Sequence, residues 1–379
     1  MSQIRPTLLT SCSALILYSV SLFAYADAFS DVYSEFQSAL AANQHKKALK
    51  LAEKSYHLGV EKFGENSVNT EALIFNYGNM LVANYQYKDA ISVFMEVERR
   101  YEKRYGKYSA ELFELYITIV DAMDSLDEKT ERLFRKQHVD YLRKIILKMP
   151  GALDDLGDPE AAIALYYQGA LAIKSAAYLP SFNSSIVKYM DRAIAMMSKH
   201  LNIQDERLIM VQFLQADFLK IAGDEDKAIA QLENIVQSFE HLGEANHRLA
   251  LLSRGRLVAF FEDAGESEKA TEHCVAIGKM TPWNENQYAQ PIYRIEADYP
   301  NNYESLQKEG SALISYEIDD KGFVRNAEIK ATQGGSLFGE AAKKAIEKWR
   351  FAPKFVEGKA VSVKGQQTNY RFFVRRFNL

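Results

Sequence analysis

Two parts of this chain repeat themselves at a spacing of 42 residues. The segment Gly223-Asp224-Glu225-Asp226-Lys227-Ala228 recurs as Gly265-Glu266-Ser267-Glu268-Lys269-Ala270. Nearer the N-terminus, Phe63-Gly64 recurs as Tyr105-Gly106 at the same spacing. A fixed period of this length is typical of repeat proteins, in which each unit is one supersecondary element that stacks on its neighbours. We therefore expect a stacked array over residues 27–280.

The array is predicted to be helical. Apolar residues recur there at helical spacing, and the whole chain has only eight prolines. Gly78, Ala90 and Phe94 resemble the small, small and bulky positions of a tetratricopeptide repeat. In that fold the small residues let two antiparallel helices approach closely. The resemblance implies an α-helical solenoid with a concave surface. Either this surface binds a partner, or the solenoid as a whole serves as a spacer.

A different pattern begins near residue 310. Apolar and polar residues alternate from Ala312 to Ile318, which predicts a half-buried strand ending at a hairpin loop, Asp319-Asp320-Lys321-Gly322. A second strand should bury Ala327, Ile329 and Ala331, and an amphipathic helix should bury a stripe from Phe338 to Trp349. A last strand alternates around Tyr370, Phe372 and Val374. The predicted order is β-β-α-β, a small α+β domain.

Several motifs accompany this order. They are Tyr299-Pro300, Glu309-Gly310, Asp319-x-x-Gly322, Ala342-x-x-Ala345 and Trp349-Arg350-Phe351-x-Pro353. The ordered set resembles the C-terminal domain of TonB-type energy transducers over about residues 290 to 377. The resemblance implies a periplasmic domain that grips transporters of the outer membrane and carries out no chemistry of its own.

The resemblance also implies where a partner binds. In that family an extended segment of the receptor adds as a strand beside the last strand, close to the Tyr-Pro segment. Strand addition has a clear physical basis, because a terminal strand leaves backbone N–H and C=O groups without partners. Glu296 stands where transducers often carry a glutamine that contacts the receptor. The implied partner-binding residues are Glu296, Tyr299, Pro300, Gln366, Gln367, Thr368, Asn369, Tyr370, Arg371, Phe372 and Phe373.

The N-terminus predicts export. Arg5 is the only charge before an apolar run from Leu8 to Ala24, and Ala24-Tyr25-Ala26 fits a cleavage site. Residues 1–26 are therefore a signal peptide, or residues 8–24 remain as an inner-membrane anchor. Energised members of the family couple to a proton-driven motor through a histidine in an N-terminal membrane helix, whereas the first histidine here is His45. Either coupling would then pass through another protein, or this chain would be a soluble accessory.

Composition argues against several other functions. The formal charge is −4, and residues 290–379 hold 15 Lys and Arg against 11 Asp and Glu, without the aromatic interleaving typical of nucleic-acid binding. No His-Glu-x-x-His or phosphate-binding loop occurs, so we expect no metal, no cofactor and no enzyme activity. Of the two cysteines, Cys274 falls at the bulky position of its repeat, where a packed thiol is expected.

The sequence thus predicts four segments: a signal peptide or anchor (1–26), a tetratricopeptide-like domain (27–280), a linker (281–289) and a TonB-type domain (290–379). The favoured function is support of energy transduction to TonB-dependent transporters of the outer membrane, with inner-membrane motor proteins or another transducer as further partners. The alternative is a periplasmic scaffold whose repeats bind another envelope protein. Homodimerisation through the C-terminal domain is a further option.

Overall fold

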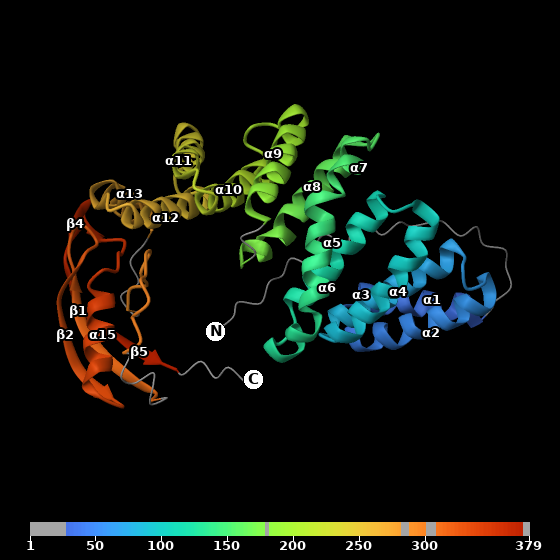
Figure 1. The fold of residues 1–379 in the computed structure, drawn as a ribbon, viewed down its shortest axis with the longest axis horizontal. Coiled ribbons are helices and arrows are strands. Elements are labelled where there is room, and N and C mark those ends of the chain that lie inside the picture. The colour runs from blue at the N-terminus through green and yellow to red at the C-terminus, as the bar shows by residue number, and fades with distance from the viewer. Residues whose placement is uncertain (1–27, 179–181, 282–287, 301–307, 374–379) are drawn as a thin grey trace. The chain divides into compact units, whose positions relative to one another are not determined.

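The computed structural model describes residues 28–178, 182–281, 288–300 and 308–373 (Figure 1). The described residues fall into two compact units. One contains the chain up to Arg104 together with Ser125–Thr130, and the other contains Tyr105–Asp124 together with the chain from Glu131 onward. This division runs through the helical region. The domain boundaries expected at residues 26, 280 and 289 stay a prediction.

Helices fill the chain up to Met280. The first part holds α1 (Ala28–Ala41), α2 (His45–Phe63), α3 (Val68–Ala83), α4 (Tyr87–Tyr105), α5 (Ala110–Asp124) and α6 (Glu128–Leu147). The second holds α7 (Pro150–Asp154), α8 (Pro159–Ile173), the 3₁₀ helix η2 (Lys174–Tyr178), α9 (Asn183–His200), α10 (Glu206–Ile221), α11 (Glu225–His241), α12 (Arg248–Asp263) and α13 (Ser267–Met280). The expected tetratricopeptide-like solenoid is confirmed.

The 42-residue period reappears in the turns between helices. Asn43, Tyr85, Gly223 and Gly265 all have a positive φ, of 54°, 62°, 91° and 77°. After each of them the next backbone N–H bonds back to the helix just completed, for example from Gln86 to Leu81 and from Glu266 to Phe261. The repeat therefore encodes one turn geometry, in which a left-handed residue ends the first helix of a pair and the second begins two residues later.

Gly78 and Phe94 show why small residues recur inside the helices. Gly78 lies on α3, and a Cβ added there would collide with the Phe94 ring of α4. Phe94 and Ala90 are fully buried. The glycine therefore makes room for the aromatic ring that holds the two helices together, as the repeat pattern predicts.

The helices from α10 to α13 share one core. Leu232, Phe261 and Cys274 belong to it, and the half-buried Ile292 and Tyr293 pack against it from beyond the last helix. Cys274 is fully buried, which confirms the packed thiol expected from its repeat position. Figure 1 shows α12 and α13 beside the strands of the C-terminal domain.

The C-terminal domain is a three-stranded antiparallel sheet covered by one helix. Its strands are β1 (Gly310–Ile318), β2 (Val324–Gln333) and β5 (Val363–Phe372), in the order β2-β1-β5, and its helix is α15 (Ser336–Ile346). The core contains Tyr316, Phe338, Trp349, Phe351 and Tyr370. The predicted β-β-α-β arrangement is confirmed.

Three details differ from the sequence-based expectation. α15 ends at Ile346, so Trp349 reaches the core from the residues after the helix. A two-stranded hairpin, β3 (Lys354–Val356) with β4 (Lys359–Val361), occupies the expected loop. Ala331 is exposed because a bulge after Ile329 breaks the alternation in β2. Val374 lies outside the described residues.

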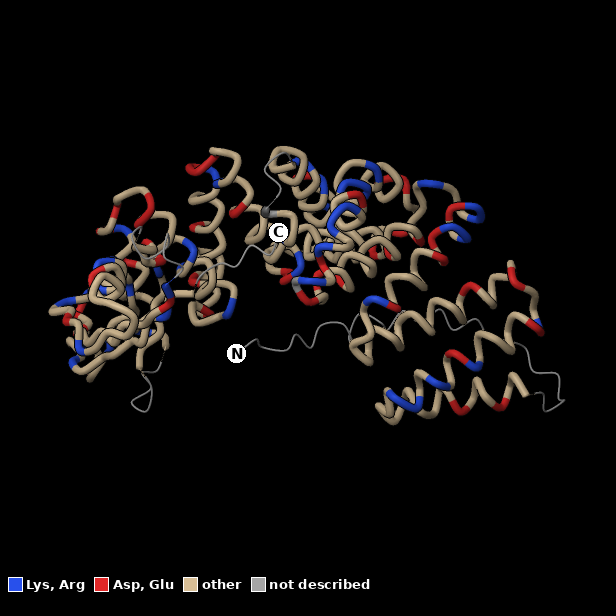
Figure 2. Tube along the Cα trace, turned by 60° about the horizontal axis from the view of Figure 1, so that its bottom comes forward, with Lys and Arg blue, Asp and Glu red and all other residues tan. Residues whose placement is uncertain are grey.

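Both signs of charge are interspersed along the helices and strands (Figure 2). Within the described ranges, we find no helix that is both long enough and apolar enough to span a bilayer. The predicted signal or anchor segment, residues 1–26, falls outside those ranges.

Candidate partner-binding site

The strand β5 forms one edge of the sheet. It pairs with β1 on one side, in register from Tyr316–Gln366 to Gly310–Phe372. Within the described part of the chain, no backbone hydrogen bond reaches its other side. A bulge at Lys364 and Gly365 separates Val363 from this regular stretch. Residues 366–372 therefore present seven consecutive positions of uninterrupted strand.

The opposite edge, β2, is irregular. Its pairing with β1 slips twice, once beside Leu313–Ile314 and once between Ser315 and Glu317. Asn326, in the second slip, has a φ of 51°. Bulges of this kind twist an edge and discourage pairing with another strand. The two edges of the sheet thus differ in their capacity to accept a further strand.

The direction of the free backbone groups on β5 follows from the first hairpin. Asp319 N–H donates to Phe323 O at 2.9 Å, toward β2. Backbone groups alternate along a strand, so Ala312, Ile314 and Tyr316 face β5 instead. Their partners Tyr370, Thr368 and Gln366 then use their own backbone groups toward β1. The N–H and C=O of Gln367, Asn369 and Arg371 consequently point to the free side.

A lead-in segment, residues 288–300, packs along β5 through side chains. The Ala289 N–H donates to Gln366 Oε1 at 2.8 Å, and the Ala297 N–H donates to the Tyr370 hydroxyl at 2.8 Å. Trp349 Nε1 donates to the Ile295 carbonyl at 2.9 Å. These bonds reach core-facing side chains, so they leave the free backbone groups of β5 untouched.

Glu296 closes a small polar cluster on this segment. Its carboxylate accepts a hydrogen bond from Tyr370 Oη and pairs with Arg294 Nε at 3.1 Å. The guanidinium of Arg294 lies 5.1 Å from the centroid of Trp349 and 5.4 Å from that of Tyr370. Burial, followed by the bond to Glu296, raises the pKa of Tyr370. Sequence reasoning missed Arg294, although its charge lies two residues before Glu296.

Tyr299 and Pro300 come at the end of the segment. The ring of Tyr299 meets Phe338 and Phe372 edge-on, with centroid distances of 5.7 and 5.8 Å. Its hydroxyl donates to the Lys308 carbonyl. The tyrosine therefore braces the C-terminal end of β5 against α15, and Pro300, next to it, is half-buried.

The predicted site residues fall into three groups. Gln366, Thr368, Tyr370 and Phe372 point their side chains toward the core; Gln367, Asn369, Arg371 and Phe373 point theirs away; Glu296, Tyr299 and Pro300 belong to the lead-in segment. The structure brings all three groups together around β5. Phe373, just past the strand, is 65% exposed. Whether they bind a partner stays a prediction.

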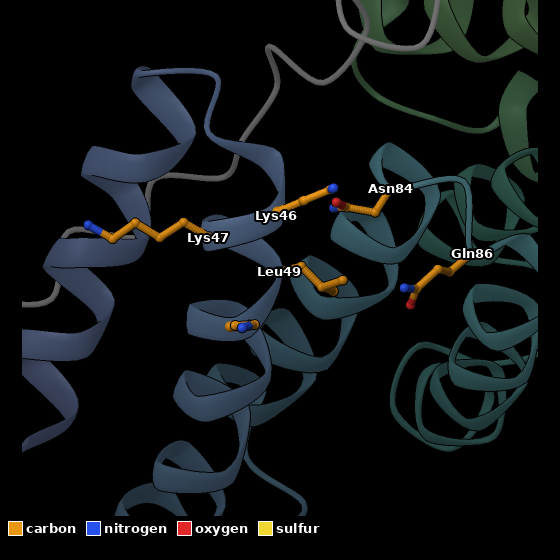
Figure 3. A pocket seen from close by; sticks show the side chains of 6 residues that line it. Lys46, Lys47, Leu49, Asn84 and Gln86 are labelled. Atoms are coloured by element: carbon orange, nitrogen blue, oxygen red, sulfur yellow. The ribbon is translucent and has the colours of Figure 1, made fainter.

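A second feature lies in the other compact unit, at the start of α2. A hollow of about 510 Å³ is lined by Lys46, Lys47, Leu49, Lys50, Asn84 and Gln86. Figure 3 shows Lys46 pointing toward Asn84, whereas Lys47 extends to the other side of α2. Among the described residues these three lysines have no ion pair, and α2 has neither an acidic residue in its first turn nor a capping side chain. Positive charge therefore gathers at a helix end that is itself positive.

The described residues hold no cluster of three or more His, Cys, Asp or Glu side chains that could bind a metal ion. The chemistry that the described residues offer at β5 is backbone hydrogen bonding.

Comparison with known proteins gives the C-terminal domain its family. Residues 295–373 match the family described as Gram-negative bacterial TonB protein C-terminal. This part of the chain is a TonB C-terminal domain. Among solved structures, the TonB2 protein from Vibrio anguillarum is similar, with 29% identity, coverage of 25% of this chain and 91% of that one, and a TM-score of 0.21.

The helical region has its own counterparts. TPR-like repeats of a protein described as a kinesin light chain from Podosopora anserina share 14% identity, and the alignment covers 66% of this chain and 92% of that one, with a TM-score of 0.33. A single-residue variant of the same protein gives 14% identity, 65% and 90% coverage and a TM-score of 0.32. No curated protein matches the chain.

Proposed function

We propose that the TonB C-terminal domain binds an extended segment of an outer-membrane transporter, which adds as a fourth strand beside β5. In this proposal the chain acts in the periplasm and supports energy transduction from the inner membrane, without catalysing a reaction. Strand addition would run along residues 366–373. Its partner would be a TonB-dependent transporter.

The contrast between the two sheet edges carries this proposal. β5 offers a regular edge from Gln366 to Phe372, whereas β2 is bulged at two places. Proteins usually protect a long regular edge, because it invites pairing with another chain. An edge left regular on one side only favours a strand-adding partner on that side.

The outward backbone groups set the bonding that a partner can gain. Gln367, Asn369 and Arg371 each offer one N–H and one C=O, so a matched strand can form up to six hydrogen bonds. Each is worth roughly 0.5–1.5 kcal/mol net. Ordering the partner offsets much of this gain. Selectivity would therefore come from side chains, with Arg371 suited to an acidic neighbour and the exposed Phe373 to an apolar one.

The compartment and the coupling are part of the same proposal. Residues 1–26 would direct export, and would be removed or would leave residues 8–24 as an inner-membrane anchor. Force would reach this chain through an inner-membrane motor protein or another transducer. The helical array would span the distance between that source of force and the receptor.

A single proline tests strand addition. Asn369→Pro removes an outward N–H and leaves the β1–β5 ladder intact, since proline is tolerated on an edge where its missing donor faces solvent. The probes are synthetic peptides from the periplasm-facing segments of the source organism's TonB-dependent transporters. We expect one or more to bind the wild-type chain, with the Asn369 amide becoming protected from hydrogen exchange, and Asn369→Pro to weaken that binding at least tenfold.

The matched control lies on the other edge. Thr332 on β2 pairs with Ala312, whose backbone groups face β5, so the Thr332 N–H also points outward. Thr332→Pro should leave peptide binding unchanged. Equal affinities for wild type and Asn369→Pro would refute strand addition at β5. Concentration-dependent dimerisation abolished by Asn369→Pro, with no peptide bound, would instead assign this edge to a second copy of the chain.

A second function, that of an adaptor, is favoured by the hollow on α2. Lys46 and Lys50 carry charges without ion pairs among the described residues, beside the amide side chains of Asn84 and Gln86. Such a surface suits an acidic segment of another envelope protein.

Replacing residues 29–200 by an unrelated helical rod keeps α10–α13, which contact the C-terminal domain, and so separates the adaptor from the transducer. A spacer should be replaceable without loss of transport, whereas an adaptor should not. Lys46→Glu with Lys50→Glu should then reproduce the loss, while Lys199→Glu, a change at an exposed position of α9, should have no effect.

A further inference from the structure

Arg350 belongs to the Trp-Arg-Phe motif of the TonB C-terminal domain, yet the acid that pairs with it, Glu262, lies on α12 outside that domain. Its side chain is 1% exposed. One terminal nitrogen, Nη1, donates to the Glu262 carboxylate on α12. The other, Nη2, donates to Thr271 Oγ1 on α13 at 2.8 Å and to the Lys321 carbonyl at 3.1 Å. The guanidinium thus joins both helices of the last helical hairpin to the domain's own first hairpin loop.

The surroundings of this ion pair exclude water. The Arg350 guanidinium carbon lies 3.6 Å from the centroid of Phe323, so one face of the cation is covered by an aromatic ring. Glu262 is 11% exposed and also accepts from Ser267 Oγ at 2.8 Å. Removing one partner of such a buried pair is costly, because the remaining charge stays buried without compensation.

Close backbone contacts surround the pair. Gly278 on α13 lies so near Pro353 that an added Cβ would collide with the Pro353 carbonyl. Phe355 of β3 packs on the same glycine, with an added Cβ 3.1 Å from Cε2. Gly322, in the first hairpin loop, lies over Cys274, where an added Cβ would stand 3.6 Å from the cysteine Cβ. The helix therefore meets the domain backbone to backbone, and the loop of Gly322 lies against the Cys274 side chain at its Cβ.

A third tie comes from the lead-in segment. The Tyr293 hydroxyl donates to Asp263, the last residue of α12, at 2.8 Å. Tyr293 also exchanges backbone hydrogen bonds with Arg350, at 3.2 and 3.0 Å. Desolvation, with the bond to Asp263, raises the pKa of Tyr293 to about 12. Tyr293 of the lead-in segment is thus hydrogen-bonded both to α12 and to Arg350.

We propose that Arg350, Glu262 and Thr271 form a latch that joins the TonB C-terminal domain to α12–α13 as one rigid body. The β5 edge is then held at a fixed orientation to the end of the array, and force applied to the helices reaches the domain through packed side chains as well as through the connecting chain. The mechanical part of this statement rests on the function proposed above, whereas the latch itself does not.

Cys274 reports on the latch directly. Its side chain is fully buried in the core of α10–α13, with its Cβ against the loop of Gly322, and in a chain carrying Cys12→Ser it is the sole thiol. A small disulfide reagent can reach it only when the domain lifts from α13, or when the core of α10–α13 or the whole chain opens. The rate of labelling in native buffer, measured with and without low urea, therefore measures latch opening.

Glu262→Gln should raise this rate roughly 100-fold or more, because it leaves the Arg350 charge buried without a counter-charge. The rate should depend weakly on urea, as local opening exposes little surface. Hydrogen exchange of β1 amides should stay as in wild type. Glu266→Gln is the matched control, since Glu266 is an exposed neighbour paired only with Lys269 among the described residues, and it should label at the wild-type rate.

Thr271→Val provides a second, milder variant, with an expected increase of roughly tenfold from the loss of one hydrogen bond to a charged group. Labelling of both variants within threefold of wild type would overturn the latch. A rise in the labelling rate matched by faster exchange of β1 amides would also overturn it, because the whole domain would then be unfolding.

Binding of the transporter peptides is measured on the same samples. Its absence in wild type would refute the proposed function, while the labelling rates would still decide the latch.

Discussion

The backbone N–H of Ala297 donates to the hydroxyl of Tyr370 at 2.8 Å, and that hydroxyl in turn donates to Glu296. One side-chain oxygen therefore holds two consecutive residues of the lead-in segment against β5. Tyr370 is 6% exposed, so the bonds form where water competes poorly. The position of the lead-in segment beside the candidate binding edge depends on this contact.

Tyr370→Phe should lower the free energy of unfolding of the C-terminal domain by about 1–2 kcal/mol, because it leaves the Ala297 N–H without its acceptor while the ring packing is kept. Urea unfolding followed by tryptophan fluorescence, in a chain carrying Trp283→Phe so that Trp349 is the sole reporter, would measure the change. Tyr288→Phe removes a hydroxyl from a ring that is 51% exposed and should change stability by less than about 0.5 kcal/mol. Equal losses in the two variants would contradict the structural role of the Tyr370 bonds.

The sequence predicts those strands of the C-terminal domain in which apolar and polar residues alternate without interruption. The alternation from Ala312 to Ile318 corresponds to β1, because both neighbours of that central strand pair with it and it has no bulge of its own. In β2 the alternation fails at Ala331, since a bulge shifts the register and turns this residue outward. An edge strand can bulge without disturbing a second partner, and nothing in its composition marks the place.

Contacts between distant segments escape this kind of reasoning. Arg350 and Glu262 are 88 residues apart, and the residues next to each of them in the sequence do not indicate that the two side chains pair. The motif that contains Arg350 identifies the domain but not what the arginine touches. The candidate edge was located through the family resemblance, which implies strand addition beside the last strand. The direction of its free backbone groups needed the hydrogen bond of the first hairpin.

The glycine inside α3 should be intolerant of even one extra carbon. Gly78→Ala places a methyl group against the Phe94 ring, which is fully buried. We expect a loss of about 1–3 kcal/mol, as is typical of overpacking. The comparison is Gly151→Ala on α7, where an added Cβ meets nothing within 4 Å. Thermal unfolding of both variants would measure the difference, and Phe94→Leu should partly rescue Gly78→Ala by vacating the space.

A buried acid supports the first repeats. Glu71 on α3 is 3% exposed and receives two hydrogen bonds from Arg104, at 2.6 and 3.1 Å. Glu71→Gln keeps the shape but removes the charge, and we expect a loss of about 2 kcal/mol, within the range for bonds between charged groups. Glu61→Gln, on the exposed face of α2, should stay within about 0.5 kcal/mol of wild type. If Glu71→Gln lowers the free energy of unfolding no more than Glu61→Gln does, the Glu71–Arg104 pair makes no net contribution to stability. Many exposed ion pairs behave in this way.

His273 should make the chain sensitive to mild acid. Burial, with the neighbouring Arg254, lowers the pKa of His273 to about 4 from its ordinary value of 6.5. Nδ1 lies 3.2 Å from Arg254 Nη1, which can only donate, so this nitrogen accepts and the folded ring stays neutral. As the pH falls below 6.5 the unfolded chain takes up a proton that the folded chain does not, so stability present above pH 6.5 is lost on the way to pH 4.

Between pH 6.5 and 5 the loss of stability from this one residue is on the order of 1–2 kcal/mol. Urea unfolding at the two pH values would measure it in wild type, in His273→Gln and in His241→Gln, which changes an exposed histidine of α11. His273→Gln should lose most of the pH dependence in this window, because the amide does not titrate, whereas His241→Gln should keep it. An unaltered slope in His273→Gln would mean that the folded ring accepts a proton beside Arg254, and that the geometry at Nδ1 relaxes to allow it.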